Sequence, residues 1–291
     1  MIISIVKLVR PHQWVKNIVI FAAVIFSKNF FNLQYLERSI IAFGVFCVAS
    51  GAVYIFNDII DARADRNHPQ KSRRPIAAGD ISLAMAIIYF VVMFAGAVVL
   101  SYFIFNIHFF KVVSIYILLN ILYSIVLKRI VILDVVIISI NFVLRAVAGV
   151  YAIASTLEFS TWLIICTFFL SLFLALSKRR AEVELLEERA EKHRRALRDY
   201  STKLLDEMIA VVTASTVMSY TLYTISTSTV EKFGTVNLVY TVPFVVFGIF
   251  RYLFLIHMRK EGGSPTRILY RDRPLIINLV LWVISCMLIL Y

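Results

Sequence analysis

The stretch SLAMAIIYFVVMFAGAVVLSYFIF, residues 82–105, carries no charged side chain. A helix needs about 20 predominantly apolar residues to cross the hydrocarbon core of a bilayer, so this stretch predicts a membrane-spanning helix. The whole chain of 291 residues has the same character, since 60% of its residues are hydrophobic, 16% are charged and the mean hydropathy is +0.84. This composition excludes a water-soluble globular protein, a disordered chain and a disulfide scaffold.

Eight further apolar runs have a comparable composition. They lie at about 18–27, 39–57, 109–127, 130–153, 160–177, 205–229, 236–257 and 274–291. They are long and rich in Ile, Val, Leu and Phe, and they lack the regular turn spacing of a β-barrel. We therefore predict an all-α polytopic membrane protein, residues 1–291 forming a single domain of about nine spans. The first run is short and flanked by Trp14 and Lys16, so it can begin as an interfacial segment.

The net charge of +12 has a topological explanation. When the runs are threaded alternately through a membrane, the loops on one side hold 24 Lys and Arg residues and those on the other side hold four. Such an excess is typical of cytoplasmic loops. We therefore expect a protein of the cell (inner) membrane, surrounded by membrane lipids, with a cytoplasmic amino terminus and Tyr291 outside. Nucleic acid is not needed to explain the charge. The cysteines Cys47, Cys166 and Cys286 stand singly and indicate neither a disulfide nor a zinc site.

An acidic motif ends the second apolar run. Its polar residues are Asn57, Asp58, Asp61 and Asp65. On a helix, residues four apart are rotated by only about 40°, so these side chains share one face. Three carboxylates on one face repel one another unless a cation joins them, and oxygen ligands of this kind suit Mg²⁺. The alternative is a solvated helix end with salt bridges to Arg63 and Arg66.

A basic loop follows directly. Pro69, Pro75 and Gly79 interrupt any helix there, so we expect residues 58–80 to include a cytoplasmic loop beside the carboxylates. The loop carries Lys71, Arg73 and Arg74. Fixed cations next to a carboxylate-bound metal are the arrangement that a pyrophosphate leaving group requires.

Further basic residues lie in or near the apolar runs. Arg145 lies inside a predicted span, where an ionisable side chain indicates function, whereas Arg251 is near a span end and can snorkel. Residues 178–203 predict a solvated cytoplasmic helix with two charge pairs, Glu188 with Lys192 and Glu191 with Arg195. Lys178, Arg179 and Arg180 stand where the sixth run emerges, and they suit either an anion site or a basic surface near anionic lipid.

These motifs resemble a known family. NDxxDxxxD at 57–65, followed by RPIAAG at 74–79, is similar to the UbiA superfamily of membrane prenyltransferases, and the likeness covers nearly the whole chain. Four other stretches resemble its decaprenyl-phosphate phosphoribosyltransferase branch: RPHQWVKNIVIFAA (10–23), YSIVLKRIVILDVVIIS (123–139), FVLRAVAGV (142–150) and SKRRAEVELL (177–186). The resemblance implies a central cavity open to the cytoplasm. It also implies transfer of phosphoribose from phosphoribosyl pyrophosphate to a polyprenyl phosphate with Mg²⁺, for cell-wall or glycoconjugate precursors.

One motif of the wider superfamily is incomplete. Aromatic prenyltransferases carry a second acidic motif, DxxxD, that helps to bind a second metal. This chain has Asp134 but Ile138 four residues later, with Lys128, Arg129 and Arg145 nearby in the sequence. We expect direct contacts from cations to replace the second metal.

The resemblance also implies residue roles. The expected metal ligands are Asn57 and Asp61, supported by Asp58 and Asp65, and the expected catalytic residues are Asp61, Asp58 and Arg145. The expected substrate-binding residues are Lys16, Tyr54, Lys71, Lys128, Arg145, Lys178 and Arg179. The segments 58–80 and 178–203 are expected over the active site. No protein nucleophile is needed, because an ionised lipid phosphate can attack the ribose directly and invert its configuration.

Two other functions remain as alternatives. A UbiA-type enzyme could move a polyprenyl chain from its diphosphate to an aromatic acceptor, but the missing second motif and the added cations disfavour this. A transporter would leave the acidic face at 57–65 without a purpose. The sequence leaves open the lipid length and whether the chain forms a homo-oligomer.

Overall fold

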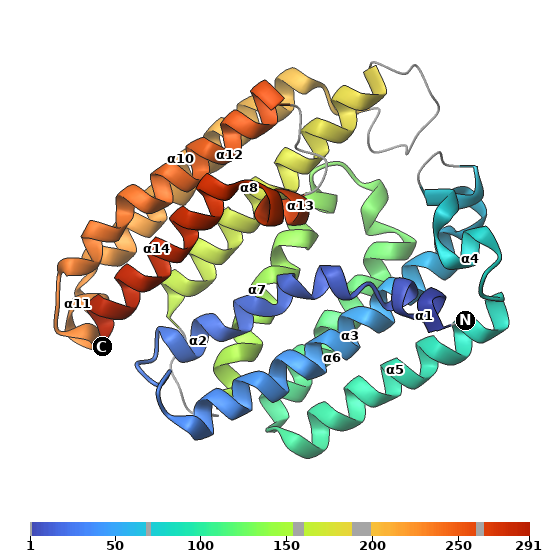
Figure 1. Ribbon diagram of the computed structural model, residues 1–291, viewed down its shortest axis with the longest axis horizontal. Helices are drawn as coiled ribbons and strands as arrows, with labels where there is room; N and C mark the ends of the chain where they lie inside the picture. Colours follow the sequence, from blue (N-terminus) through green and yellow to red (C-terminus); the bar gives the residue numbers. More distant parts are fainter. Residues whose placement is uncertain (1, 68–70, 154–159, 188–198, 260–264) are drawn as a thin grey trace. The chain divides into compact units, whose positions relative to one another are not determined.

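The computed structural model describes residues 2–67, 71–153, 160–187, 199–259 and 265–291 (Figure 1). These residues form α-helices and short 3₁₀-helices, with no strand among them. Eight helical stretches in the described ranges are long and apolar enough to cross a membrane. They are α3 (Leu33–Arg66), α5 (Leu83–Ile104), α6 (Ile107–Ile125), α7 (Leu133–Ile153), α8 (Thr161–Glu187), α10 (Thr202–Ile225), α14 (Arg273–Leu290), and α12 (Val242–Arg259) together with η4 (Asn237–Thr241) before it. The predicted all-α membrane fold is confirmed.

The first predicted run takes a different form. Residues up to 25 form α1 (Ile2–Val9), the 3₁₀-helix η1 (Pro11–Ile20) and the short α2 (Phe21–Ile25). Arg10 has a left-handed backbone, with φ of 56°, and Pro11 follows it at the start of η1, so α1 cannot continue. At the usual rises per residue, η1 and α2 together extend about 27 Å, close to a bilayer core of about 30 Å. The count of nine spans therefore stays a prediction.

Side-chain caps set where several long helices begin. Asn32, Ser82, Asn106 and Ser201 each accept a hydrogen bond from a backbone N–H in the first turn of the helix that follows. Asp272 caps α14 in the same way. Such caps satisfy donors that the first turn leaves unpaired, and each contributes about 1 kcal/mol to helix stability.

The two predicted loops are partly helical. Residues 58–66 are the last turns of α3, and η2 (Lys71–Arg73) and α4 (Pro75–Ala78) follow them. Gly79 ends α4 with φ of 84°, a conformation that glycine adopts without strain. In the segment 178–203, α8 continues to Glu187 and α10 starts at Thr202. The predicted pairs at 188/192 and 191/195 lie outside the described residues.

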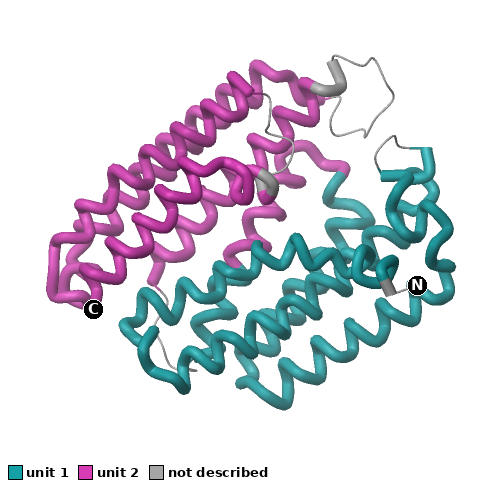
Figure 2. The backbone as a smooth tube through the Cα atoms, in the orientation of Figure 1, with its two compact units in different colours: residues 1–128, 144–159 teal, residues 129–143, 160–291 magenta. Residues whose placement is uncertain are grey.

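The chain divides into two compact units, shown in teal and magenta in Figure 2. Unit 1 comprises Met1–Lys128 and Leu144–Phe159, and unit 2 comprises Arg129–Val143 and Ser160–Tyr291, so α7 contributes to both. Unit 1 is built on α3, whose buried face packs around Phe46, Phe109 and Tyr116. Unit 2 is built on α8 and α10, with a core around Phe173, Leu205 and Tyr252.

Within unit 1, a close backbone contact fixes η1 against α7. A Cβ atom at Gly149 would stand 2.2 Å from the carbonyl oxygen of Ile20, which no side chain tolerates. Glycine is therefore required at this position. The contact holds the buried face of η1, with Asn17, next to the helix that carries Arg145.

Candidate active site

In unit 1, two acidic residues at the end of α3 are held by arginines from other elements. Arg10 donates a hydrogen bond to Oδ1 of Asp58, and Nη1 of Arg74 lies 3.0 Å from the same oxygen. Arg74 also donates to Oδ2 of Asp65 over 2.6 Å. Only 2% of the Asp58 side chain is exposed. Burying carboxylates this deeply is costly unless cations pair with them, so the arginines are what permit Asp58 and Asp65 at these positions.

Arg10 also contacts Tyr54, one turn before Asp58 on α3. The guanidinium carbon of Arg10 lies 5.5 Å from the centre of the Tyr54 ring, within the range of a cation–π interaction. The left-handed backbone of Arg10 aims its side chain from the junction of α1 and η1 toward α3. Tyr54 therefore lies beside the acidic motif with Arg10 as its partner, and its contact with the donor stays a prediction.

The other two residues of the motif face a different set of partners. The hydroxyl of Ser124, on α6, donates to Oδ1 of Asn57. Nζ of Lys128, in η3 (Leu127–Arg129), lies 2.6 Å from Oδ1 of Asp61. Lys128 is buried, whereas 21% of the Asp61 side chain is exposed. By their partners, the four polar residues therefore divide into an arginine-bound pair and a pair beside Ser124 and Lys128.

The second pair fits a magnesium site that substrate completes. Asn57 and Asp61 are one helical turn apart and offer an amide oxygen and a carboxylate. The described residues contain no group of three or more His, Cys, Asp or Glu that could hold a metal by themselves. Mg²⁺ commonly uses one or two carboxylates and takes its remaining ligands from water and substrate phosphates. The donor set is therefore compatible with Mg²⁺ bound together with a pyrophosphate.

Arg145 lies buried on α7, inside unit 1. Its Nε donates to Oδ1 of Asn17 over 2.8 Å, and its Nη2 donates to the hydroxyl of Tyr116 over 2.8 Å. Asn17 in turn donates to Oγ of Ser50, 3.3 Å away on α3. These contacts give Arg145 a fixed position between η1, α6 and α7. Asn17 and Tyr116 are both neutral side chains.

Two lysines predicted to bind substrate lie elsewhere in unit 1. Lys16 is on η1 and Lys71 begins η2, and both are partly buried. Lys16 lies close enough to affect His12: partial burial lowers the pKa of the His12 imidazole, and the charges of Arg10 and Lys16 lower it further. His12 is therefore neutral near pH 7, and the positive charge of this segment comes from Arg10 and Lys16.

In unit 2, Arg179 is committed to carboxylates. Its Nε lies 2.7 Å from Oδ2 of Asp134, and its Nη1 donates to Glu182. Lys178 lies 3.5 Å from the same Glu182 and is much more exposed. Arg180, which the sequence grouped with them, bonds Asp206 and Glu184 instead. Asp134, which has no acidic partner at 138, is thus the counter-ion of Arg179.

The chain matches a known protein family. The model of the UbiA prenyltransferase family matches residues 18–270. The chain belongs to this family. It is 33% identical to a decaprenyl-phosphate phosphoribosyltransferase of Corynebacterium glutamicum. The match extends over 293 residues and covers 99% of this chain and 87% of that protein. A protein of the same name from Mycolicibacterium smegmatis is 31% identical over 292 residues, 96% of this chain and 90% of the relative.

Solved structures agree on the fold. A UbiA homologue from Archaeoglobus fulgidus, solved with GPP and Mg²⁺, matches with a TM-score of 0.73 at 19% identity, over 99% of both chains. At this identity the likeness shows the UbiA fold alone. The resemblance inferred from the sequence motifs is therefore confirmed, both for the UbiA family and for the branch that the curated relatives name.

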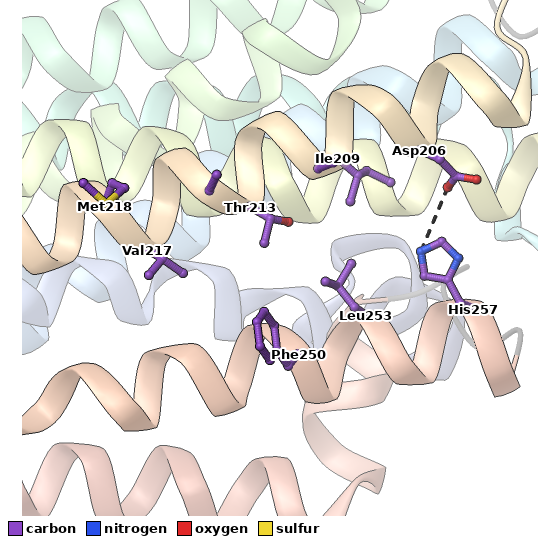
Figure 3. Close-up of a pocket in the computed structure, with 10 residues that line it drawn as sticks. Asp206, Ile209, Thr213, Val217, Met218, Phe250, Leu253 and His257 are labelled. Carbon is purple, nitrogen blue, oxygen red and sulfur yellow. Dashed lines mark ion pairs between the residues drawn. The ribbon is translucent and has the colours of Figure 1, made fainter.

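Two cavities lie within the part of this UbiA protein that the structure describes, and both are largely apolar. In unit 2, a cavity of about 570 Å³ lies between α10 and α12, with Asp206 and His257 facing each other at one end, 4.0 Å apart (Figure 3). Its remaining lining is apolar apart from Thr213, so it offers little to a phosphate. In unit 1, a cavity of about 330 Å³ is lined by Val9, Trp14, Phe43, Gly44, Cys47, Val48 and Met93. Both cavities suit hydrocarbon rather than a polyanion.

Several polar residues that contact the predicted residues within each unit had no predicted role. Arg10 and Asn17 stand in the motif RPHQWVKN, and that likeness could have found them. Ser124 also lies in a stretch that resembles the branch. Tyr116 and Tyr200 lie in stretches without any motif, and only the folded chain brings them to Arg145 and Asp134.

Proposed function

We propose that this UbiA protein moves the 5-phosphoribosyl group of phosphoribosyl pyrophosphate to a decaprenyl-like polyprenyl phosphate and releases pyrophosphate, in the synthesis of cell-wall or glycoconjugate precursors. The names of the curated relatives support the donor and acceptor classes. The observation that carries the proposal is the contact between Asp61 and buried Lys128, one turn from Asn57. This contact supports the proposal because it pairs Asp61, our proposed metal ligand, with a fixed cation, the combination that a pyrophosphate leaving group requires.

Asn57 and Asp61 hold Mg²⁺ in this proposal. Bound there, Mg²⁺ would supply positive charge for the departing pyrophosphate. Lys128 and Lys71 bind phosphate oxygens of the donor. Asp58 and Asp65 act indirectly, because they hold Arg10 and Arg74 beside the motif.

The remaining predicted residues bind or orient the substrates. Tyr54 contacts the donor, and Lys178 and Arg179 bind its phosphate oxygens. Arg145 provides a fixed positive charge for the phosphates, and Lys16 binds the acceptor phosphate or the donor. An ionised phosphate is a nucleophile without a base, so it attacks the ribose carbon opposite the leaving pyrophosphate. An α-linked donor then gives a β-linked product.

The apolar cavity of unit 1 is our candidate for the first isoprene units of the acceptor. Cys47 lines this cavity, and its Sγ lies 3.4 Å from Nδ2 of Asn17, whose Oδ1 accepts from Arg145. An isoprenoid chain in this cavity would begin near Arg145. The loop charges support an active site and amino terminus on the cytoplasmic side, with Tyr291 outside.

A crossed-substrate assay tests the proposal. Purified protein with Mg²⁺ receives either phosphoribosyl pyrophosphate and a polyprenyl phosphate, or a polyprenyl diphosphate and an aromatic acid. Pyrophosphate release in the first mixture only, and only when both substrates are present, is the expected result. Release in the second mixture only would establish the aromatic prenyltransferase alternative instead.

A further inference from the structure

The hydroxyl of Tyr200 lies at the centre of a buried cluster in unit 2. Tyr200 stands just before α10, and its hydroxyl donates to Oδ1 of Asp134 over 2.9 Å. The hydroxyl oxygen of Tyr200 also accepts a hydrogen bond from the backbone N–H of Ile132 over 2.7 Å. Burial raises the pKa of Tyr200, and the charge of Asp134 raises it further, so the hydroxyl keeps its proton. It therefore donates and accepts at once.

The bond to Ile132 supports a strained turn. Ile132 has φ of 69°, a left-handed conformation that a β-branched residue rarely adopts. Ile132 is 50% exposed, so packing of its side chain does little to hold the conformation. The turn leads directly into α7, whose first turn carries Asp134. The Tyr200 hydroxyl thus bonds both the strained residue and the carboxylate that the turn positions.

Asp134 uses both of its oxygens within this cluster. Oδ1 accepts from Tyr200 and Oδ2 accepts from Nε of Arg179, and only 1% of the residue is exposed. A carboxylate engaged in this way serves as a counter-ion. It fixes the guanidinium of Arg179 from the buried side.

The other carboxylate on Arg179 is of a different kind. Glu182 is one turn away on α8, and 29% of its side chain is exposed. It is shared with Lys178. An ion pair that water reaches is weak, so an incoming anion can exchange with it far more readily than with buried Asp134.

We propose that Tyr200 is a positioning residue for phosphate binding: it holds Asp134, and Asp134 holds Arg179 so that a phosphate oxygen of the donor replaces Glu182. The inference rests on the proposed function, in which Arg179 binds the donor. It assigns opposite effects on donor binding to Tyr200 and to Glu182. Loss of the Tyr200 hydroxyl weakens donor binding, and loss of the Glu182 charge strengthens it.

The test uses Tyr200→Phe in the full-length protein. The KM for phosphoribosyl pyrophosphate should rise about tenfold while kcat stays within about twofold, because one hydrogen bond to a charged group is worth about that much. The dissociation constant of magnesium pyrophosphate, measured by calorimetry, should rise equally. Tyr252→Phe is the matched control: Tyr252 is buried in the same core, and its hydroxyl has no hydrogen-bond partner in the described part of the chain. It should change neither quantity.

Glu182→Gln supplies the opposite arm. It should lower the donor KM and the dissociation constant of magnesium pyrophosphate by about threefold, the discounted worth of a partly exposed ion pair. An unchanged KM in Tyr200→Phe, an equal change in Tyr252→Phe, or a raised KM in Glu182→Gln would each overturn the inference. If the wild type transfers no phosphoribose, the proposed function fails, and the pyrophosphate binding constants still decide the role of Tyr200.

Discussion

Asp58→Asn and Asp61→Asn should separate the two halves of the acidic motif. Asp58 receives hydrogen bonds from Arg10 and Arg74 and is 2% exposed. A hydrogen bond to a charged group contributes about 1.5–3 kcal/mol, and asparagine keeps one acceptor oxygen. We therefore expect Asp58→Asn to lose about 3 kcal/mol of stability, or roughly 6–12 °C in melting temperature. Asp61→Asn weakens the partly exposed contact with Lys128, so it should lose less, about 1 kcal/mol.

The activities should run the other way. Asp61→Asn removes the carboxylate proposed to bind the metal, so kcat/KM should fall about 10²–10³-fold and more Mg²⁺ should be needed for half-maximal rate. Asp58→Asn, assayed well below its melting temperature, should stay within about tenfold of wild type with an unchanged Mg²⁺ requirement. Differential scanning fluorimetry in detergent gives the stabilities, and a Mg²⁺ titration of the rate gives the metal requirement.

Two results would refute this division. Asp61→Asn with at least half of the wild-type rate would remove Asp61 from the metal site. If Asp58→Asn raised the Mg²⁺ requirement as much as Asp61→Asn and left the stability unchanged, Asp58 would be a metal ligand, and the partners seen in the structure would not define the roles.

Three further changes test other parts of the site. Arg145→Lys cannot reproduce the two directed contacts of the guanidinium, so the donor KM should rise about tenfold, and steady-state kinetics with an unchanged KM would make Arg145 merely structural. Gly149→Ala would press its Cβ on the carbonyl of Ile20, so it should cost about 2 kcal/mol or more in a thermal melt, and an unshifted melting temperature would contradict the close packing of η1. Gly44→Leu meets no atom within 4 Å at its Cβ and fills the unit 1 cavity, so it should raise the acceptor KM and spare the donor KM, whereas an unchanged acceptor KM would move the isoprenoid chain elsewhere.

The membrane fold was largely predictable because a bilayer imposes strict demands on composition and length. The run at 82–105 became α5 (Leu83–Ile104), with Ser82 as its cap. The first run was the exception. Arg10, with its left-handed backbone, and Pro11 end α1, and the run at 18–27 then divides between η1 and α2, a division that hydropathy does not resolve.

The site was predictable only where its residues share one helix. Spacing alone placed Asn57, Asp61 and their neighbours on one face of α3. It could not show which partners each would meet, since Ser124 lies 67 residues from Asn57, and Tyr200 lies 66 from Asp134. Those contacts arise from tertiary packing. Packing also pairs Asp58 and Asp134 with arginines, which spacing along the sequence did not predict.

The most direct test of the central claim follows the sugar. Purified protein is incubated with Mg²⁺, phosphoribosyl pyrophosphate labelled in its ribose carbons and a short polyprenyl phosphate, and the organic phase is counted and examined by mass spectrometry. We predict label in a lipid whose mass is that of the acceptor plus one phosphoribosyl group, which disappears when Mg²⁺ is chelated and in Asp61→Asn. If the protein is folded and the label stays in the aqueous phase, the protein does not transfer phosphoribose to a polyprenyl phosphate.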